Sequence, residues 1–270
     1  MSREQIELSS FEKIRAFTGN VGSRQSEIDA GEWQLRVDLA ATYRLVALYG
    51  WDDLVFTHIS CRIPGPDKHF LINPYGLLFE EVTASSLVRI DVDGYKIDAS
   101  PHAVNPAGFA IHSAIHRAHD NAHCVLHLHT DAGMAVAAQA DGLLPVTQYG
   151  MVMGGDLAYH DFGGPGMHAD EGTAIAAELG ERHNMILRGH GTLSVGRSCA
   201  DAFIRAYVLQ RACAAQIAAM AGGAPLYRAH QGVAEQMAAL SLPSFHGANG
   251  GLAWPALLRK LDRIDPGFRM

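Results

Sequence analysis

A chain of 270 residues with 48% hydrophobic residues is long enough to bury a complete core without disulfides. Its formal net charge of −7 leaves no basic stripe of the kind that binds nucleic acid. Its Ala-rich uncharged stretch from Ala212 to Tyr227 is too short to cross a bilayer. We therefore expect neither a nucleic-acid-binding protein nor a membrane protein.

The N-terminus and the cysteines indicate the compartment. The first ten residues are charged and lack the apolar segment of a signal peptide. The four cysteines are widely spaced and form no CxxC pair, which is typical of buried thiols in a reducing environment. We expect a cytoplasmic protein with a polar arm over residues 1–28 and, since no linker composition interrupts the rest, a single domain over residues 29–270.

The first half of the domain predicts one long helix followed by short strands. Apolar residues recur at helical spacing from Ile28 to Tyr49, and Gly50 ends the pattern. Alternating or apolar runs then predict strands over residues 54–63, 69–73, 87–92, 95–99 and 122–128. Asp93-Gly94 is a hairpin signal, and residues 106–119 have the pattern of a helix.

The second half predicts more helices around two further strands. Thr130 can cap a helix that runs through Ala140, and Ser198 can cap a long helix that runs to Ala221. The other elements are expected to be a Gly-rich loop over residues 153–166, a helix over 169–183, two short strands within 185–196, and helices near 230–240 and 252–264. The order of elements predicts an α/β fold in which a mixed sheet carries helices on both faces.

Two histidines one residue apart, His127 and His129, stand at the end of the strand predicted over residues 122–128. Because side chains alternate along a strand, both imidazoles would project to the same side, as a divalent metal requires. Without a third ligand, two such histidines are more often hydrogen-bonded or solvated than bound to a metal. His190, however, lies between two glycines at the end of another strand, where it can approach a crowded centre. The three histidines together predict a metal site.

A rival group of histidines, His112, His116 and His119, lies on one face of the helix predicted over residues 106–119. The i, i+4 spacing can hold zinc, but Ser113 stands where an HExxH site has its glutamate. Apolar residues share this helix. We therefore predict that this group is structural or supports the metal ligands from behind.

Several segments, in this order, resemble the class II aldolase/adducin family. They are NPAGFAIHSAIHRA (105–118), HLHT (127–130), LLPVTQYG (143–150) and LRGHGTLSVG (187–196). The resemblance implies a three-layer αβα fold with a central mixed, largely antiparallel sheet. It also implies a metal held by His127, His129 and His190, and a homotetramer with fourfold symmetry whose active sites lie between subunits.

The same resemblance implies roles for further residues. Tyr149 falls where the aldolases place a tyrosine that reaches the neighbouring subunit's site. The segment 73–76 falls on a loop that holds substrate, so Asn73, Tyr75 and Gly76 are candidate substrate-binding residues.

Two departures from the phosphosugar aldolases of the family argue against a phosphorylated substrate. His58 stands where those enzymes carry an asparagine, and Pro106-Ala107-Gly108 replaces a Ser-Ser-Glu sequence. The hydroxyls that hold a phosphate are thus absent, and Gly108 takes the place of the acid/base glutamate. Gly108 also leaves room for a flat, bulky substrate, and Arg188 could pair with one of its carboxylates.

A metal without the aldolase acid is suited to decarboxylation. Loss of CO₂ leaves an electron pair, for which a Lewis acid at a neighbouring substrate oxygen is a sink. The returning proton could come from water, His58, Tyr149 or His160. The chain is similar to bacterial metal-dependent decarboxylases of hydroxylated aromatic dicarboxylates, which implies an aromatic carboxylate substrate and Mn²⁺, with Zn²⁺ as the other candidate.

Two other functions stay open. The first is an aldolase, epimerase or dehydratase that acts on an unphosphorylated sugar acid. The second is a non-catalytic adducin-like module that serves assembly, since adducin-type domains also lack the acid glutamate. Retention of His127, His129 and His190 favours an enzyme over this module.

Overall fold

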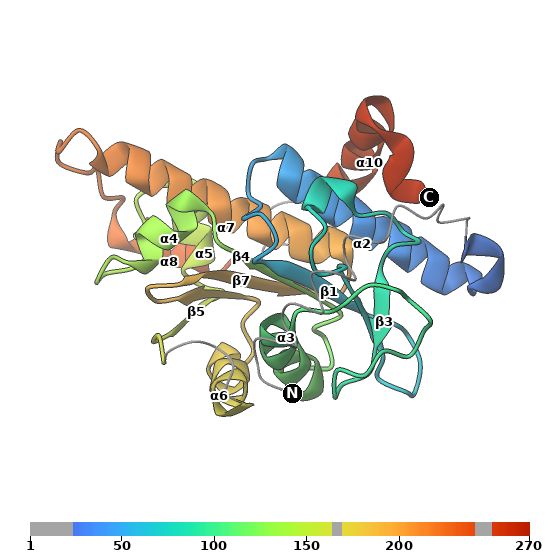
Figure 1. The fold of residues 1–270 in the computed structure, drawn as a ribbon. Coiled ribbons are helices and arrows are strands. Elements are labelled where there is room, and N and C mark those ends of the chain that lie inside the picture. The colour runs from blue at the N-terminus through green and yellow to red at the C-terminus, as the bar shows by residue number, and fades with distance from the viewer. Residues whose placement is uncertain (1–23, 164–168, 241–249) are drawn as a thin grey trace.

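The structure is a computed structural model that describes residues 24–163, 169–240 and 250–270. Its centre is a seven-stranded sheet with the strand order β3-β2-β1-β4-β7-β6-β5 (Figure 1). All neighbouring strands pair antiparallel except β5 and β6, which run parallel. The strands are β1 (His58–Arg62), β2 (Phe70–Ile72), β3 (Val88–Ile90), β4 (Cys124–Leu128), β5 (Leu157–His160), β6 (Asn184–Leu187) and β7 (Gly191–Gly196).

Helices cover both faces of this sheet. In Figure 1, α2 and α7 lie on one face together with α4 and α5, and α3 and α6 lie on the other. The helices are α2 (Ala30–Leu48), α3 (Pro106–Ala118), α4 (Asp131–Ala137), α5 (Gln148–Met153), α6 (Ala169–Leu179), α7 (Cys199–Met220), α8 (Gln231–Ala238) and α10 (Ala253–Ile264), with 3₁₀ turns η1 (Arg24–Glu27), η2 (Phe79–Glu81) and η4 (Pro266–Arg269). The predicted three-layer αβα fold with a mixed, largely antiparallel sheet is confirmed.

Alternation along β1 and β4 sends successive side chains into different layers. Ile59 and Leu126 lie in the apolar cluster beneath α2 and α7, whereas Val125 lies in the cluster beneath α3 and α6. Ser60 faces α3, to which its hydroxyl is hydrogen-bonded. His127 has the same parity as Val125, so its imidazole also lies on the α3 side of the sheet.

The elements with clear periodicity form where the sequence predicts them. The first predicted helix is α2, and the Asp29 side chain caps it by accepting the backbone N–H of Gly31 at 2.8 Å. Ser198 caps α7 by accepting the N–H of Asp201 at 3.2 Å. The predicted arm over residues 1–28 lies outside the described residues apart from η1. Within the described ranges, no helix is both long and apolar enough to cross a bilayer.

The strand predicted from residue 54 begins only at His58, so the first part of that prediction is wrong. Leu54 has a left-handed backbone with φ of 48°. The N–H of Phe56 then donates to the carbonyl of Asp53 at 2.9 Å, which turns the chain before the strand starts. The alternating letters of this segment therefore belong to a turn and not to an extended backbone.

The strand predicted over residues 95–99 is also wrong. Only an isolated bridge between Ile90 and Lys96 forms there. The Lys96 ammonium donates to the carbonyl oxygens of Ser100 at 2.9 Å and His102 at 3.2 Å, so the chain curls away from the sheet after the bridge.

The loop predicted over residues 153–166 contains β5, and α5 precedes it. The strand has four residues, too few for alternation to be visible in the sequence, and it forms by parallel pairing with β6. In α5, Thr147 accepts the N–H of Gly150 at 3.0 Å and so begins a helix without apolar periodicity.

Tyr43 of α2 ties the end of β2 to β1. Its buried hydroxyl accepts the backbone N–H of Ile59 at 2.9 Å and that of Asn73 at 3.1 Å. The hydroxyl in turn contacts two acceptors, Asn73 Oδ1 at 2.9 Å and the Ile59 carbonyl. Burial raises the pKa of this phenol well above its ordinary value. One side chain thus holds the strand that carries His58 beside the loop that begins at Asn73.

The substitution Tyr43→Phe leaves two buried backbone N–H groups without an acceptor. We expect the free energy of unfolding to fall by roughly 2–4 kcal/mol, because each orphaned buried group costs about 1–3 kcal/mol. Denaturant titration measures the loss. Tyr95→Phe, at a residue that is 72% exposed, is the matched control and should stay within about 0.5 kcal/mol of wild type. Equal losses in the two variants would contradict this role for Tyr43.

Candidate metal centre

Three histidines meet at one edge of the sheet. His127 lies near the end of β4, His129 follows that strand, and His190 lies in the turn from β6 to β7. The ring centroids of His127 and His129 are 4.7 Å apart, and that of His190 lies 4.8 Å and 4.9 Å from them. One ligand nitrogen from each residue lies within 4.8 Å of the other two. The structure therefore brings together the three residues that the sequence predicts as ligands.

Two imidazoles are oriented by oxygen atoms behind them. His127 Nδ1 lies 3.1 Å from the Thr192 carbonyl oxygen, and His129 Nδ1 lies 3.0 Å from Asp53 Oδ2. Both partners accept, so both Nδ1 atoms carry the proton and both Nε2 atoms are bare. These two Nε2 atoms face each other at 3.0 Å. Two lone pairs at that distance fit around a cation, since nitrogens that share a tetrahedral zinc ion lie about 3.3 Å apart.

Glycines on both sides of His190 allow its approach. Gly189 has φ of 66°, a conformation that glycine adopts without strain. A Cβ on Gly191 would lie 2.6 Å from the Leu128 carbonyl oxygen and 3.0 Å from His129 Cδ2. A side chain at position 191 would therefore push β7 away from the ligand histidines.

Burial keeps the ligand imidazoles neutral. His127 is 2% exposed, and burial, aided by His129 and His58, lowers its pKa well below the ordinary value. Burial, followed by the charges of His129 and His160, lowers the pKa of His190 to about 4. Because a metal binds the neutral imidazole, these lowered pKa values keep both ligands available at neutral pH.

Asp53 is a site residue that the sequence did not reveal. The turn at Leu54 and Phe56 brings its carboxylate to His129, in the arrangement by which carboxylates orient metal-binding histidines. Its signal in the sequence is only an acidic pair, Asp52-Asp53, inside a segment that looks like the start of a strand.

His58 and the rival histidines form a buried row behind His127. His58 lies directly opposite His127 in the β1–β4 pair, and its ring is 4.7 Å from that of His112. The Ser60 hydroxyl joins His112 Nδ1 at 2.6 Å to His116 Nε2 at 2.8 Å. The partners of these two histidines are Ser60 and, for His116 Nδ1, the Ala122 carbonyl, which fits the predicted structural or supporting role.

The remaining catalytic candidates, His160 and Tyr149, come from β5 and α5. His160 ends β5, and its Nδ1 lies 2.7 Å from Glu178 Oε2. The electrostatic influence of His160 is one of the causes that lower the pKa of His190. Tyr149 lies on α5 and packs against the apolar cluster between α4, α5 and α7. The expectation that this tyrosine reaches a neighbouring subunit stays a prediction.

The substrate-binding candidates have different surroundings. Asn73 is 5% exposed and bound to Tyr43, while Tyr75 donates its backbone N–H to the Ala103 carbonyl. Gly76 has φ of 99°, so it turns the loop. The roles predicted for these residues stay predictions.

Gly108 and Arg188, the other two candidates, lie in α3 and after β6. Gly108 stands in the first turn of α3, and its surroundings lie outside what the structure describes. The Arg188 guanidinium donates to the carbonyl oxygens of Gln139 and Ala140, and it lies 3.4 Å from Asp161 Oδ1. Arg188 therefore has partners within its own chain.

Known proteins share this fold and sequence. Residues 37–217 match the Class II Aldolase and Adducin N-terminal domain. A protein of Caulobacter vibrioides assigned to the class 2 aldolases is 50% identical over 246 residues, which cover 91% of this chain and 96% of the relative. Alpha-adducin of Mus musculus is 43% identical over 203 residues, 74% of this chain and 28% of that protein. A crystal structure of an aldolase II superfamily protein from Pseudomonas syringae is 42% identical, with a TM-score of 0.86 over 92% of this chain and 100% of that one. The chain belongs to the class II aldolase and adducin family.

Removal of the Asp53 carboxylate should weaken metal binding. We expect Asp53→Ala to lower the affinity for Zn²⁺ or Mn²⁺ about 10–100-fold, because His129 loses the partner that fixes its tautomer and orientation. Isothermal titration of metal-free protein measures the change. Asp52→Ala, at the exposed neighbouring residue, is the control, and identical affinities in the two variants would refute the role of Asp53.

The stability of the metal-free protein should fall as the pH is lowered below about 6.5. Burial lowers the pKa of His58 to about 4, of His116 to about 3, and of His112 well below its ordinary value. An unfolded histidine titrates near 6.5, so the unfolded chain binds more protons below that pH. The stabilisation is complete above about pH 6.5 and is lost as the pH falls toward the folded pKa values.

Between about pH 6.5 and pH 5, the free energy of unfolding should fall by roughly 2 kcal/mol for each of these three histidines. Denaturant titrations across this range measure the slope. His116→Gln should reduce the slope of the free energy of unfolding against pH by about the amount that one proton contributes. His119→Gln, at the residue that follows α3, is the control for this slope. A slope that His116→Gln does not alter would argue against burial as its origin.

Proposed function

We propose that this chain is a divalent-metal-dependent carbon–carbon lyase that removes CO₂ from a hydroxylated aromatic dicarboxylate. The observation that supports this most is the pair of bare Nε2 atoms of His127 and His129, 3.0 Å apart with His190 beside them. The proposed substrate is 3-hydroxy-2-methylpyridine-4,5-dicarboxylate, an intermediate of vitamin B6 degradation. Mn²⁺ is the proposed cation and Zn²⁺ the alternative, since imidazole ligands suit both.

The chain's own residues prepare the centre for this chemistry. A divalent cation bound there supplies Lewis acidity, which stabilises the charge left on a substrate oxygen when the neighbouring C–C bond breaks. Thr192 and Asp53 hold two ligands in one tautomer, so no reorganisation is needed on binding. His127 is buried, so bulk water does not reach its imidazole from the interior of the protein.

The reaction also needs a proton, which Gly108 cannot supply. We infer that His160 supplies it, because Glu178 orients its Nδ1 and its Nε2 is buried without a hydrogen-bond partner. A histidine whose Nδ1–H donates to a carboxylate carries a proton on Nε2 as well only in its doubly protonated form, and in that form it can deliver the Nε2 proton to the carbon that CO₂ leaves. His58 is the weaker candidate, since burial lowers its pKa to about 4 and leaves it unprotonated at neutral pH.

We propose that the protein acts in the cytoplasm as a homotetramer with fourfold symmetry and active sites between subunits. Leu54, Phe56 and Phe162 are large apolar residues with exposed fractions of 61%, 55% and 55%. Leu54 follows Asp53, and the Phe162 ring lies 5.8 Å from that of His190. Exposed apolar side chains gathered around a site are typical of an interface.

Two alternatives have support of their own. The bacterial relative assigned to the class 2 aldolases favours an aldolase, epimerase or dehydratase that uses the same centre on an unphosphorylated sugar acid. The 43% identity to alpha-adducin favours a non-catalytic module for assembly. The contacts that orient His127 and His129 support an enzyme, because assembly does not require aligned ligand nitrogens.

The Mn²⁺-loaded protein should release CO₂ from 3-hydroxy-2-methylpyridine-4,5-dicarboxylate and lose this activity with a chelator. His160→Gln should lower kcat about 10²–10⁴-fold with its metal content unchanged, since general acids contribute that much. His119→Gln, at a histidine bound to the Ala176 carbonyl, is the matched control. Carbon dioxide release and elemental analysis are the measurements.

Other outcomes separate the alternatives. Full decarboxylase activity in His127→Ala would refute the proposed centre. Products from unphosphorylated sugar acids, with no CO₂ from the dicarboxylate, would favour the aldolase, epimerase or dehydratase. Protein that binds no divalent metal would favour the assembly module.

A further inference from the structure

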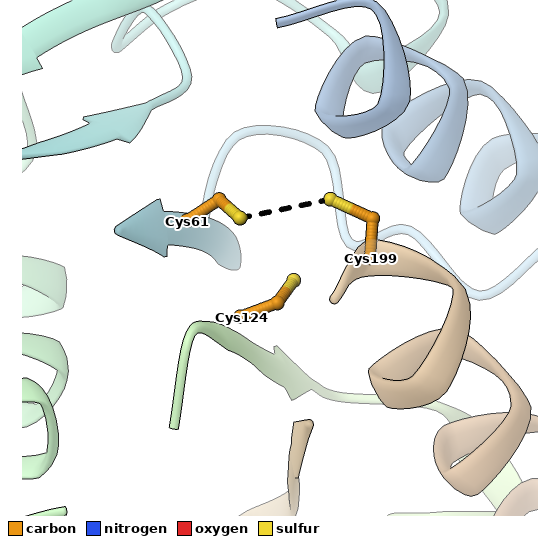
Figure 2. Close-up of side chains that lie close together, drawn as sticks. All are labelled: Cys61, Cys124 and Cys199. Atoms are coloured by element: carbon orange, nitrogen blue, oxygen red, sulfur yellow. Dashed lines mark hydrogen bonds between the residues drawn. The ribbon is translucent and has the colours of Figure 1, made fainter. Parts of the chain in front are cut away.

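A second group of metal-ligating side chains lies at the other end of the same strands. Cys61 stands near the end of β1, Cys124 begins β4, and Cys199 is the first residue of α7 (Figure 2). Cys61 and Cys124 are directly opposite each other in the antiparallel β1–β4 pair. All three belong to the apolar cluster beneath α2 and α7, so thiols from three distant segments converge on one point.

The distances suit a shared cation. The Sγ atoms of Cys61 and Cys199 are 3.8 Å apart, and all three sulfurs lie within 4.8 Å of one another. Sulfurs that share a tetrahedral zinc ion, each at about 2.3 Å, lie about 3.8 Å apart. A disulfide needs about 2.05 Å, and the four described cysteines are free. The spacing is therefore that of neighbouring ligands and not that of a bonded pair.

Local electrostatics favour negative charge on one of these sulfurs, that of Cys61. Cys199 begins a helix of 22 residues, whose dipole favours a thiolate. The hydrogen bond from Cys124 also lowers the pKa of Cys199, but the hydrogen bond with Cys61 and burial outweigh this and raise it well above its ordinary value. Burial likewise raises the pKa of Cys124, so the cation itself has to displace these two protons. Hydrogen bonds from the thiols of Cys124 and Cys199 lower the pKa of Cys61. Burial, and after it the charge of Cys199, raises the pKa of the nearby Asp38 to about 6. This carboxyl is therefore protonated more easily than an ordinary aspartate.

Burial alone does not explain the cluster. An isolated buried cysteine packs as a small apolar residue, as Cys213 does within α7, where burial raises its pKa to about 12. Cys61, Cys124 and Cys199 instead turn their sulfurs toward one another (Figure 2). Among the described residues, no further His, Cys, Asp or Glu joins this group. Three thiolates without an oxygen ligand select Zn²⁺ or Cu⁺ rather than Mn²⁺.

We propose that Cys61, Cys124 and Cys199 form a second metal site, separate from the histidine centre, for one thiophilic d¹⁰ cation, Zn²⁺ or Cu⁺. Binding releases the three thiol protons to solvent and forms three metal–sulfur bonds, with no change of oxidation state. The cation joins β1 and β4 to the start of α7. Because each of the three residues is at most 2% exposed, the cation enters while the chain folds.

Refolding with Cd²⁺ under reducing conditions tests the site. The full-length chain, unfolded and refolded with Cd²⁺ and then freed of loose metal, should show the ultraviolet charge-transfer band of cadmium–thiolate bonds. Cadmium on imidazoles gives no such band, so the histidine centre does not interfere. Cys61→Ser and Cys124→Ser should each lose the band and retain one cadmium ion fewer than wild type, whereas Cys213→Ser should keep both.

Thermal unfolding gives a second readout. Zn²⁺ or Cu⁺ at about a hundredfold excess over its dissociation constant should raise the melting temperature roughly 5–10 °C more in wild type than in Cys124→Ser. Displacement of the cadmium band by Zn²⁺ would assign zinc, and displacement by Cu⁺ alone would assign copper; either supports the site. Wild-type protein that refolds without the band would overturn the proposal, even if the serine variants do not fold. A band that survives in the Cys61→Ser–Cys124→Ser double variant would also overturn it.

Discussion

Strand β4 is paired antiparallel on both sides, with β1 and with β7, and this pairing positions both candidate metal-binding groups. The end of β4 lies beside the start of β1 and the turn that opens β7, which brings His127 opposite His58 and next to His190. The start of β4 lies beside the end of β1, which brings Cys124 opposite Cys61. Cys124 and His127 are three residues apart on β4, and side chains alternate along a strand, so the thiol and the imidazole lie on opposite faces of the sheet. A slip of one residue in this register would exchange the faces and abolish both groups.

Burial affects the two groups in opposite ways. A histidine binds metal in its neutral form. Burial disfavours the charged form, so the low pKa of His127 leaves this residue in the form that binds metal. A cysteine binds metal as a charged thiolate, and burial raises the pKa of Cys124 well above its ordinary value. The cysteine cluster therefore depends on the start of α7 and on hydrogen bonds among the thiols, whereas the histidine centre needs only a dry setting and fixed tautomers.

The relatives of this chain include proteins assigned to the class 2 aldolases as well as adducins, so the fold alone does not decide the function. What supports an enzyme in this chain is the set of contacts behind the ligands, with a carbonyl behind His127 and a carboxylate behind His129. Gly108 in α3 has no side chain that could act as an acid. The proton donor that we propose instead is His160 at the end of β5, whose Nδ1 lies beside Glu178.

Much of the fold, and the grouping of the three candidate ligand histidines, could be predicted from the sequence. Helical periodicity and the i, i+2 spacing of His127 and His129 are properties of contiguous residues. Asp53 could not be predicted, because a left-handed turn at Leu54 interrupts an alternating segment and only that turn aims the carboxylate. The short strand β5 was missed for a related reason, since parallel pairing with β6 and not its own four residues makes it a strand. The cysteines looked like isolated buried thiols along the chain. Only the tertiary structure decided that three of them meet, because convergence depends on strand register and on where α7 begins, which no local pattern encodes.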